Sequence, residues 1–501
     1  MSRQTALELI DLVFDRDSWE SWNHDLIDPI ATGSYAAELA MAREKTGVDE
    51  SVIVGTALLR GNRVALLACE FGFLAGSIGI AAGRRLVAAI ERATASRLPL
   101  IALPVSGGTR MQEGATAFLQ MVNITVAVTA HKAAKLPYLV YLRNPTTGGV
   151  FASWGSLGHI TVAEPGALIG FIGPRVYEAL HGEPFPPDVQ TAENLQACRL
   201  VDGVLPPEQL TEFFDRALRI MTSRKELEKR ISTVVMADSP RASSWEAVLA
   251  SRRPGRPGVR ELLSVAADDV LPLYGYGKGP KDSGLVLALV RFGEVPCVLV
   301  GQDRYGKTSQ QALSPVDLRQ ARRGIRLAQE LDFPLVTVID TAGAALSKEA
   351  EEDGLAGEIA RCLSELVTLR TPTVSLLLGQ GSGGGALAML PADRVLAAKH
   401  GWLAPLPPEG ASAIIHRDVT HASDMAFSQK VGAADLYAAG IVHAVISECS
   451  DAADEPIQFC ERVGGAVHAA LTTLIGQLPE KRLADRIEHF KRIGEEVGAT
   501  V

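Results

Sequence analysis

Residues 137–153 read PYLVYLRNPTTGGVFAS, and residues 372–388 read PTVSLLLGQGSGGGALA. Each stretch opens with a proline, continues as an apolar run long enough for a buried strand, and then reaches adjacent glycines. The second stretch begins 235 positions after the first (372 minus 137), and at this offset the pair Gly148–Gly149 matches the pair Gly383–Gly384. The chain therefore contains the same strand and glycine turn twice.

The same offset links neighbouring segments. Pro99 in LPLIALPVSGG stands 235 positions before Pro334 in FPLVTVIDTAG, and AEPG at 163–166 falls on AKHG at 398–401. Apolar runs of strand length alternate with helical periodicity, which predicts βαβ units and mostly parallel sheets. We therefore predict an α/β chain built by internal duplication of one unit. Its boundary is expected near residue 240, where a charged segment gives way to Ser, Ala and Pro.

The second glycine run also matches G-x-G-x-x-G, the pattern of a dinucleotide site. Such a site needs an acidic residue about 20 positions further on, at the tip of the next strand. The next apolar run, residues 394–398, ends in Lys399 and His400 instead. The matching turn at residues 145–149 lacks the pattern altogether, so we reject a dinucleotide site.

Adjacent glycines at the start of a helix have a direct physical meaning. The first helical turn leaves backbone N–H groups unpaired, and glycine has no Cβ to keep a ligand away from them. Two such amides, with the helix dipole behind them, stabilise a developing oxyanion. One glycine pair could serve only a tight turn, but two pairs at matching places favour a site that handles two oxyanions.

Three further motifs carry candidate side chains. SGGTRMQEG at 106–114 predicts either an anion-binding turn with Arg110 alongside or a plain βα turn with that arginine in solvent. LAGSIG at 74–79 resembles a nucleophile elbow around Ser77, but the ten histidines occur in no motif, so we set a hydrolase triad aside. Asp340 could act as a base or, as we prefer, as a cap. The chain thus offers many backbone donors and few acid–base side chains, which fits chemistry in which the substrate or cofactor carries its own base.

The composition is that of an ordinary globular protein, with 47% hydrophobic and 21% charged residues. The net charge of −9 argues against a general binder of nucleic acid or membrane surfaces. The six cysteines are scattered without a C-x-x-C pair, so we expect no zinc ribbon, no disulfide framework and no bound metal. Neither a signal-peptide layout nor an apolar run of ~18 residues is found, so we expect a soluble cytoplasmic protein.

The first copy resembles the β subunit of the acetyl-CoA carboxylase carboxyltransferase. The matching segments are FGFLAGSIG (71–79), SGGTRMQE (106–113), LPYLVYL (136–142), NPTTGGVFAS (144–153) and AEPGALIGFIGPRV (163–176). The second copy resembles the α subunit through IDTAG (339–343), GQGSGGGALA (379–388) and LPPEGASAI (406–414). Residues 244–258 look like the entry to the second domain of single-chain acyl-CoA carboxylase β chains. The resemblance covers nearly the whole chain, in order.

This resemblance implies two tandem crotonase-like (ClpP/crotonase) domains, residues 1–240 of β type and 241–501 of α type. It also implies the second half-reaction of a biotin-dependent carboxylase. Carboxybiotin, carried on a biotinylated carrier or biotin carboxylase subunit, would give its carboxyl group to acetyl-CoA or a related short acyl-CoA, with malonyl-CoA or a homologue as product. Both the ureido oxygen and the thioester oxygen gain negative charge, so two oxyanion holes are required.

The resemblance also assigns residues. It places the hole for the acyl-CoA enolate at the N–H groups of Gly148 and Gly149, and the hole for biotin at Gly384 and Gly385. The internal offset points instead to Gly383 and Gly384, and we follow the family register. Residues assigned to ligand binding are Gly76, Ser106, Gly107, Gly108, Arg110, Arg175 and Gly383. Candidates for the CoA phosphates are Arg84, Arg85, Arg110, Arg175 and Lys307.

In this family the working site lies between the first copy of one chain and the second copy of another, so a homo-oligomer is expected, a dimer or a trimer of dimers. The chain departs from the family in its second copy, with DTAGAA from Asp340 where DTPGAY is usual and GQGSGGG from Gly379 where GEGGSGG is usual. Two other functions stay open. One is a biotin-independent decarboxylase subunit of the malonate type, and the other is a non-catalytic scaffold paralogue in a carboxylase complex.

Overall fold

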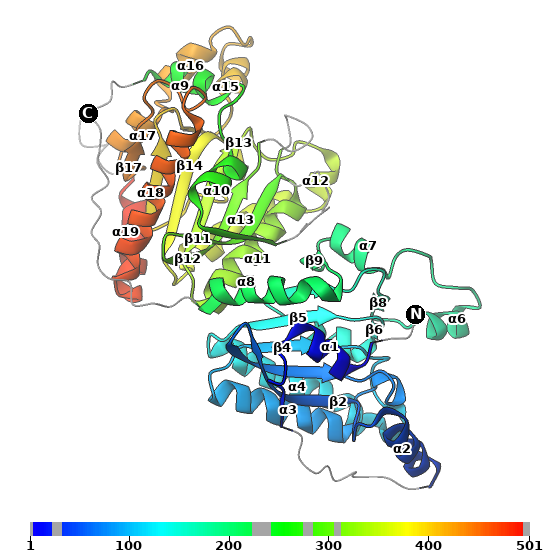
Figure 1. Cartoon of the computed structure of the whole chain (residues 1–501). Helices are drawn as coiled ribbons and strands as arrows, with labels where there is room; N and C mark the ends of the chain where they lie inside the picture. Colours follow the sequence, from blue (N-terminus) through cyan, green and yellow to red (C-terminus); the bar gives the residue numbers. More distant parts are fainter. Residues whose placement is uncertain (1–3, 23–32, 223–241, 274–283, 305–311, 494–501) are drawn as a thin grey trace. The chain divides into compact units, whose positions relative to one another are not determined.

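The computed structural model describes residues 4–22, 33–222, 242–273, 284–304 and 312–493 (Figure 1). The chain divides into two compact units. Unit 1 comprises residues 1–222 with 273–279, and unit 2 comprises residues 223–272 with 280–501. The boundary expected near residue 240 falls within 223–241, outside the described residues.

Unit 1 is built on a seven-stranded sheet in the order β1-β2-β3-β4-β5-β7-β9. Its strands are β1 (Glu20–Ser21), β2 (Val52–Leu59), β3 (Asn62–Cys69), β4 (Leu100–Leu103), β5 (Tyr138–Leu142), β7 (Ile160–Ala163) and β9 (Gly203–Val204). The first three pair antiparallel and the rest pair parallel. The helices α3 (Ile80–Ala95) and α4 (Gly114–Ala133) lie side by side along one face of this sheet (Figure 1).

The core of unit 1 follows from the spacing of apolar residues on α3. Ala82, Leu86, Ile90 and Ala93 recur at three- and four-residue intervals and are buried. They belong to one cluster with side chains of the sheet such as Leu67. Burying this stripe fixes α3 against the sheet, and thereby places the turns that follow each strand at the sheet's carboxyl edge.

Unit 2 repeats the arrangement with an eight-stranded sheet in the order β10-β11-β12-β13-β14-β15-β17, and β16 pairs β14 beside this path. Its strands are β10 (Asp269–Leu273), β11 (Leu285–Phe292), β12 (Val295–Gln302), β13 (Leu335–Thr341), β14 (Thr373–Ser382), β15 (Arg394–Ala398), β16 (Trp402–Ala404) and β17 (Ala444–Ile446). β11 and β12 pair antiparallel, and β12, β13, β14, β15 and β17 pair parallel in turn. The α/β class expected from the sequence is confirmed.

The remaining elements complete the two units. In unit 1 they are α1 (Ala6–Val13), α2 (Gly33–Thr46), η1 (Leu74–Gly76), η2 (Met111–Glu113), β6 (Thr146–Thr147), α5 (Gly148–Phe151), η3 (Trp154–Ser156), β8 (Ile169–Gly170), α6 (Pro174–His181), α7 (Ala192–Ala197), η4 (Pro207–Gln209) and α8 (Leu210–Thr222). In unit 2 they are α9 (Ser244–Ser251), α10 (Val259–Ala266), α11 (Pro315–Leu331), α12 (Lys348–Glu352), α13 (Leu355–Thr368), α14 (Gly383–Leu387), α15 (Pro408–Ile415), α16 (Ala422–Ser428), α17 (Ala433–Ala438), α18 (Pro456–Ile475) and α19 (Pro479–Arg492).

One strand is longer than the sequence suggested. The apolar run at 373–378 was expected to give way to a turn at Gly379, whereas β14 continues to Ser382. Gln380, Gly381 and Ser382 pair with β16, which holds them extended. Gly379 lies against the carboxylate of Asp340, since a Cβ at Gly379 would sit 2.5 Å from Oδ1 of that residue. The first glycines of the run therefore shape the end of a strand, and the helix begins only at Gly383.

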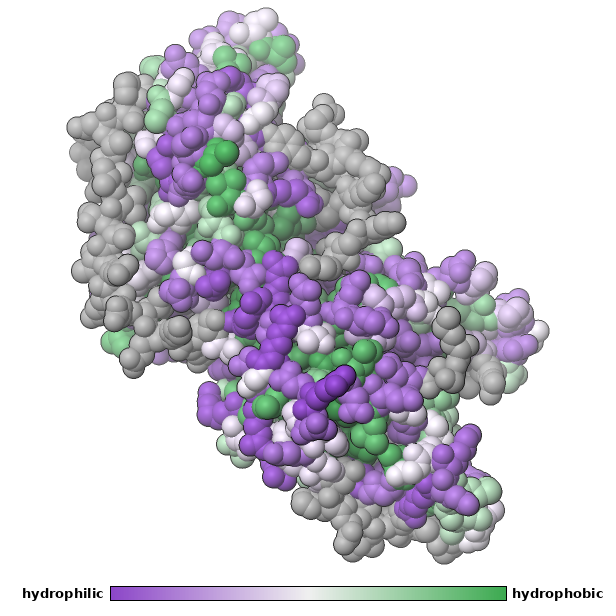
Figure 2. All heavy atoms as spheres, in the orientation of Figure 1, coloured by the Kyte–Doolittle hydropathy of each residue, from purple (hydrophilic) through white to green (hydrophobic). Residues whose placement is uncertain are grey.

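Among the described residues on the face in Figure 2, polar side chains predominate, with smaller apolar patches between them. Among the described residues, no helix combines the length and the apolar character needed to cross a membrane.

Candidate active site

Each unit carries a glycine turn where a strand gives way to a short helix. We call residues 146–150 the first glycine turn and residues 381–385 the second. Gly148 begins α5 and Gly383 begins α14, and both have φ of 62°. This left-handed backbone is open to glycine at little cost and is rare for other residues. The two turns therefore have the same entry geometry, with Gly383 as the structural counterpart of Gly148.

The amide of Gly148 already has a partner. Its N–H donates to the carbonyl oxygen of Phe171 at 3.0 Å. The next amides, of Gly149 and Val150, lie in the first turn of α5, where helical pairing supplies no acceptor. The Gly148 amide is therefore already hydrogen-bonded within the chain, and its role as a donor to a ligand stays a prediction. The next two amides along the helix are those of Gly149 and Val150. At the internal offset these two match Gly384 and Gly385, the pair expected in the second copy.

A second loop lies beside each glycine turn and has the same form in both units. Ser106 follows β4, and its Oγ accepts from the N–H of Gly108 at 2.9 Å. Thr341 ends β13, and its Oγ1 accepts from the N–H of Gly343 at 3.1 Å. Parallel bridges join Ser106 to Thr146 and Thr341 to Gly381, so each loop runs along its own glycine turn. The φ values of Gly108 and Gly343, 114° and 137°, again favour glycine.

Gly108 is close to the first glycine turn. A Cβ at Gly108 would lie 3.7 Å from Cα of Gly148 and 3.8 Å from the backbone N of Gly149. Any side chain there would stand over the amide that we regard as a donor. The glycine thus leaves the first turn open to a ligand as well as satisfying the backbone geometry.

Arg110 does not face a ligand as one of the sequence interpretations supposed. Its side chain is 1% exposed and forms a buried ion pair with Glu50. The guanidinium also donates to the carbonyl oxygen of Ser77 at 2.7 Å and to Oγ of Ser51 at 3.1 Å. All these partners belong to unit 1, so Arg110 anchors the loop after β4 from inside. The contacts of Arg110 are therefore structural, and its assignment to ligand binding stays a prediction.

The other cation candidates differ in position. Arg85 on α3 is buried and pairs with Asp49 and with the carbonyl of Val52, so it too points inward. Arg84 on the same helix is exposed and remains a candidate for the CoA phosphates. The side chain of Arg175 and the whole of Lys307 lie outside the described residues.

The remaining assigned residues lie around the first turn. Gly76 ends η1, and a Cβ there would sit 2.1 Å from the carbonyl oxygen of Val105. Gly107 donates its N–H to the carbonyl of Ala75 at 2.9 Å. Gly76 and Gly107 therefore serve the close approach of the 74–79 and 104–110 loops. Ser77 accepts from Arg110 through Oγ at 3.3 Å and belongs to the same structural network.

Asp340 was expected to cap the turn that follows its own strand, and it bonds instead to the neighbouring strand β14. Its Oδ1 accepts a hydrogen bond from the N–H of Gln380 at 3.0 Å. The backbone N–H of Asp340 donates to Oε1 of Gln302 at 2.9 Å. Burial raises the pKa of this carboxyl, an effect opposed in part by the nearby Arg304. Asp340 thus ties the ends of β13 and β14 together beneath the second glycine turn.

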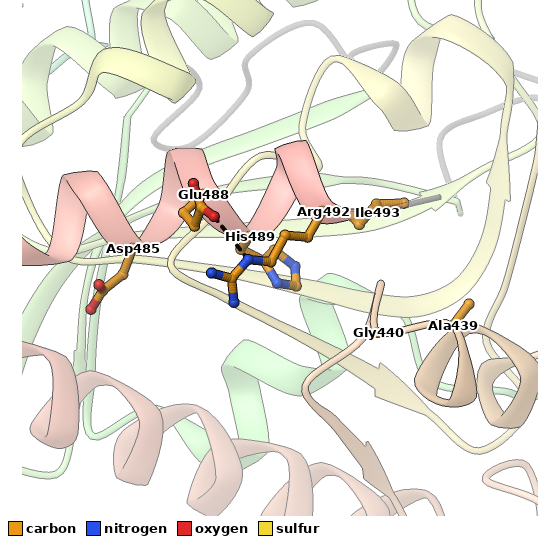
Figure 3. Close-up of a pocket in the computed structure, with 7 residues that line it drawn as sticks. All are labelled: Ala439, Gly440, Asp485, Glu488, His489, Arg492 and Ile493. Carbon is orange, nitrogen blue, oxygen red and sulfur yellow. Dashed lines mark hydrogen bonds and ion pairs between the residues drawn. The ribbon is translucent and has the colours of Figure 1, made fainter. Parts of the chain in front are cut away.

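Two hollows occur elsewhere in unit 2. One, of about 400 Å³, lies between α19 and the loop at Ala439 and Gly440, and the ion pair of Glu488 with Arg492 spans its α19 side (Figure 3). The other, of about 620 Å³, is bordered by α9, Lys399, His400 and Asp451. No residue assigned to the site lines either hollow, so neither replaces the glycine turns as the candidate. Among the described residues no cluster of three or more His, Cys, Asp or Glu side chains could hold a metal ion.

Sequence reasoning missed two side chains, Glu50 and Gln302. Glu50 neutralises Arg110, and Gln302 bonds to the second glycine turn. Neither stands in a motif, and each meets its partner across many positions of the chain. The sequence offers one signal for Gln302, which is that this polar residue ends a run that otherwise reads as an apolar strand.

Comparison with known proteins identifies the family of the chain. The carboxyl transferase domain family matches residues 1–484. The chain is 57% identical over 494 residues to the probable biotin-dependent acyl-coenzyme A carboxylase beta3 subunit of Mycobacterium tuberculosis, covering 99% of both chains. It is 35% identical over 496 residues to the acetyl-coenzyme A carboxylase carboxyl transferase subunits beta/alpha of Salinispora arenicola, covering 93% of this chain and 86% of that one.

Solved structures show the same fold. A crystal structure of transcarboxylase 12S, described as a hexamer and holding hydrolysed methylmalonyl-coenzyme A, superposes with a TM-score of 0.73 at 19% identity, covering 95% of this chain and 90% of that one. A single-chain, multi-domain long-chain acyl-CoA carboxylase gives a TM-score of 0.65 at 18% identity, covering 91% of this chain and 46% of that one. The chain belongs to the carboxyl transferase family, the carboxyltransferases of biotin-dependent acyl-coenzyme A carboxylases.

Proposed function

We propose that this chain moves a carboxyl group from the carboxybiotin of a partner protein to a short acyl-CoA, with acetyl-CoA as the acceptor and malonyl-CoA, a precursor for fatty acid synthesis, as the product. The single observation that supports this most is the pair of glycine turns, which present first-turn helix amides in the same backbone geometry. The reaction develops negative charge on two oxygens, and each oxygen needs its own donors. The relatives named above act on acyl-CoA and acetyl-CoA, in keeping with the proposed acceptor.

The chain's own part in the reaction is to supply backbone donors. We assign the amides of Gly149 and Val150 to the thioester oxygen and those of Gly384 and Gly385 to the ureido oxygen. Gly148 and Gly383 supply the left-handed entry to each turn. Bound carboxybiotin contributes the carboxyl group and the base. Removing one oxyanion donor costs roughly 3 kcal/mol of transition-state stabilisation in well-studied sites.

The proposal needs the amides of the second glycine turn to be open to a ligand. Apart from the adjacent residues, the atoms nearest to the Cβ position of Gly343 belong to Ser382 at 3.9 Å, and the atom nearest to that of Gly383 is the carbonyl oxygen of Pro405 at 3.3 Å. This glycine-lined backbone would let a ureido group reach the amides. Biotin therefore fits the residues present, with Gly384 and Gly385 holding its oxygen.

Several broader features belong to the same proposal. We take residues 1–240 and 241–501 as two crotonase-like domains that arose by duplication, supported by the matching sheet orders and loop geometry. We expect a biotinylated carrier or biotin carboxylase subunit as partner, and a cytoplasmic homo-oligomer. The hexamer described for transcarboxylase 12S is in keeping with a trimer of dimers.

The test uses the purified chain with malonyl-CoA and biocytin, a soluble substitute for the biotinylated partner. Biocytin-dependent formation of acetyl-CoA supports the proposal. Release of carbon dioxide from malonyl groups without biocytin would indicate the malonate-type decarboxylase instead, and no reaction of either kind would indicate the scaffold. Repeating the assay with methylmalonyl-CoA tests the acceptor, since a higher kcat/KM than with malonyl-CoA would overturn the acetyl-CoA assignment.

A further inference from the structure

Gln302 is the last residue of β12, and its side chain is 1% exposed. Both ends of its amide bond to the backbone. Oε1 accepts from the N–H of Asp340 at 2.9 Å, and Nε2 donates to the carbonyl oxygen of Gly385 at 2.8 Å. This one side chain therefore connects the end of β12, the end of β13 and the second glycine turn.

The second glycine turn needs such a restraint. Residues 383–385 are three successive glycines, and glycine has the widest range of backbone conformations of any residue. The hydrogen bond from Gln302 fixes the carbonyl of Gly385 and so limits the backbone rotation of Gly385. The N–H of this same residue is one of the two donors that we assign to the ureido oxygen. An amide that drifts by about 1 Å from the position of the oxyanion loses much of its effect on rate.

The first glycine turn is restrained differently. Strand registers place Ala65 opposite Leu100 and Val298 opposite Leu335, so Cys69 occupies in unit 1 the place of Gln302 in unit 2. The short side chain of Cys69 cannot reach the first glycine turn in the way that the amide of Gln302 reaches the second. Instead the counterpart of Gly385 is Val150, whose side chain is fully buried in the core. Unit 1 fixes its turn by packing a side chain, and unit 2 fixes a glycine turn with a hydrogen bond.

We infer that Gln302 is a positioning residue for carboxyl transfer, which holds the second glycine turn so that the amides of Gly384 and Gly385 point at the ureido oxygen. It touches neither reacting partner and acts through the backbone. This inference rests on the proposed function and names a residue of that site to which no motif points.

The experiment measures biocytin-dependent carboxyl transfer from malonyl-CoA by two variants of the full chain. Gln302→Met keeps the length of the side chain and removes its hydrogen bonds to Asp340 and Gly385, together with the contact of 3.3 Å to the sulfur of Met389. Gln302→Glu keeps the acceptor for the N–H of Asp340 but has no N–H for the carbonyl of Gly385. We expect kcat to fall about 100-fold in both, which is the loss typical of a small displacement of catalytic groups. The KM for malonyl-CoA should stay within about two-fold, because Gln302 is no part of the first turn that holds the thioester.

The matched control is Thr373→Val at the opposite end of β14, which removes two buried hydrogen bonds of the hydroxyl, one of 3.0 Å to the carbonyl of Thr371 and one of 3.3 Å from Arg486. It should lower the melting temperature while keeping kcat. If the Gln302 variants lose no more kcat than this control, or lose kcat only together with a raised KM for malonyl-CoA, the positioning role is refuted while the proposed function stands. If the wild-type chain shows no biocytin-dependent transfer, the proposed function fails and this inference fails with it.

Discussion

The two glycine turns have the same backbone and different supports. Gly148 and Gly383 share a φ of 62°, and each turn runs beside a loop closed by a Ser or Thr hydroxyl. Around this common backbone, the first turn is fixed by a buried valine and the second by Gln302. What the two units share is a left-handed glycine at the start of a short helix and a loop closed by a hydroxyl beside it, whereas the side chains that support them differ.

The same contrast recurs at the other end of the sheets. The N–H of Tyr138 donates to Nδ1 of His159 at 3.0 Å, whereas the matching N–H of Thr373 donates to Oδ2 of Asp393 at 2.8 Å. An aspartate and a histidine thus serve the same backbone group in the two units. Different side chains can accept a hydrogen bond from the same backbone N–H. The backbones of the two units are therefore more similar than their amino-acid sequences indicate.

The largest effect should come from removing a donor amide. Gly149→Pro and Gly384→Pro each delete one N–H, and proline is tolerated in the first turn of a helix. We expect kcat to fall about 100- to 1,000-fold. Gly149→Ala and Gly384→Ala are the matched controls, since they add a Cβ and keep the N–H. The alanine added at 149 would lie 3.1 Å from Met121, and that at 384 would lie 2.7 Å from Ile359, both flexible side chains.

These four variants also compare the turns. Gly149→Pro should lower kcat at any biocytin concentration while leaving the KM for biocytin unchanged, and Gly384→Pro should raise that KM as well. If a proline variant is no slower than its alanine control, that amide is no donor. Equal responses of the two turns to biocytin would contradict their division between the two reacting partners.

The next effect tests a support that unit 1 has and unit 2 lacks. Arg110 stiffens the loop beside the first glycine turn through Glu50, while the matching position in unit 2 is Ala345. Glu50→Gln removes the closer of two buried counter-charges and leaves the guanidinium with Glu113 at 3.5 Å, so we expect the free energy of unfolding to fall by about 3 kcal/mol. Urea denaturation measures this. Glu20→Gln is the control, since its pair with Arg63 is exposed on both sides and should contribute about 0.5 kcal/mol. Equal losses in the two variants would show that Arg110 needs no partner.

A smaller effect is expected from crowding the first glycine turn. Gly108→Ala forces a non-glycine residue to a φ of 114° and places a methyl group 3.8 Å from the N of Gly149. We expect kcat/KM for malonyl-CoA to fall about ten-fold, equivalent to about 1.4 kcal/mol. Gly114→Ala has a similar left-handed backbone with nothing within 4 Å of the new Cβ, so it should reduce stability alone. Comparable activity in the two variants would show that the space over the amides is not used.

The repeat in the sequence predicted the parts of the fold that depend on local pattern. The bridges Ser106–Thr146 and Thr341–Gly381 differ by the same 235 positions that link the two glycine pairs. Partners that meet only through the folded sheet could not be predicted. The N–H of Gly148 bonds to the carbonyl of Phe171, a partner that no motif indicates, and Arg110 reads as a surface cation until Glu50, 60 positions earlier, is placed beside it. The periodicity of apolar residues predicts which face of an element is buried. It does not predict which buried polar groups form hydrogen bonds or ion pairs with each other.

The smallest effect separates the histidine and aspartate supports. In unit 2, Nδ1 of His443 accepts from the N–H of Val395 at 3.0 Å, and in unit 1 Asp202 accepts from the N–H of Thr161 at 2.9 Å. Burial lowers the pKa of His443 to about 4, with further repulsion from His489 and Arg394. The unfolded chain therefore binds a proton at His443 more readily than the folded chain between about pH 6.5 and pH 4.

Stability should consequently fall as the pH is lowered through that window, because a protonated Nδ1 can no longer accept from Val395. His443→Gln offers an acceptor that does not titrate, so the melting temperature of this variant should depend less on pH between about 6.5 and 4 than that of the wild type. His416→Gln, at an exposed position, should leave the wild-type dependence intact. An unchanged profile in His443→Gln would mean that this histidine is charged in the folded state. The backbone at β15 would then be held without the neutral imidazole, and the exchange of aspartate and histidine between the units would have no consequence for stability.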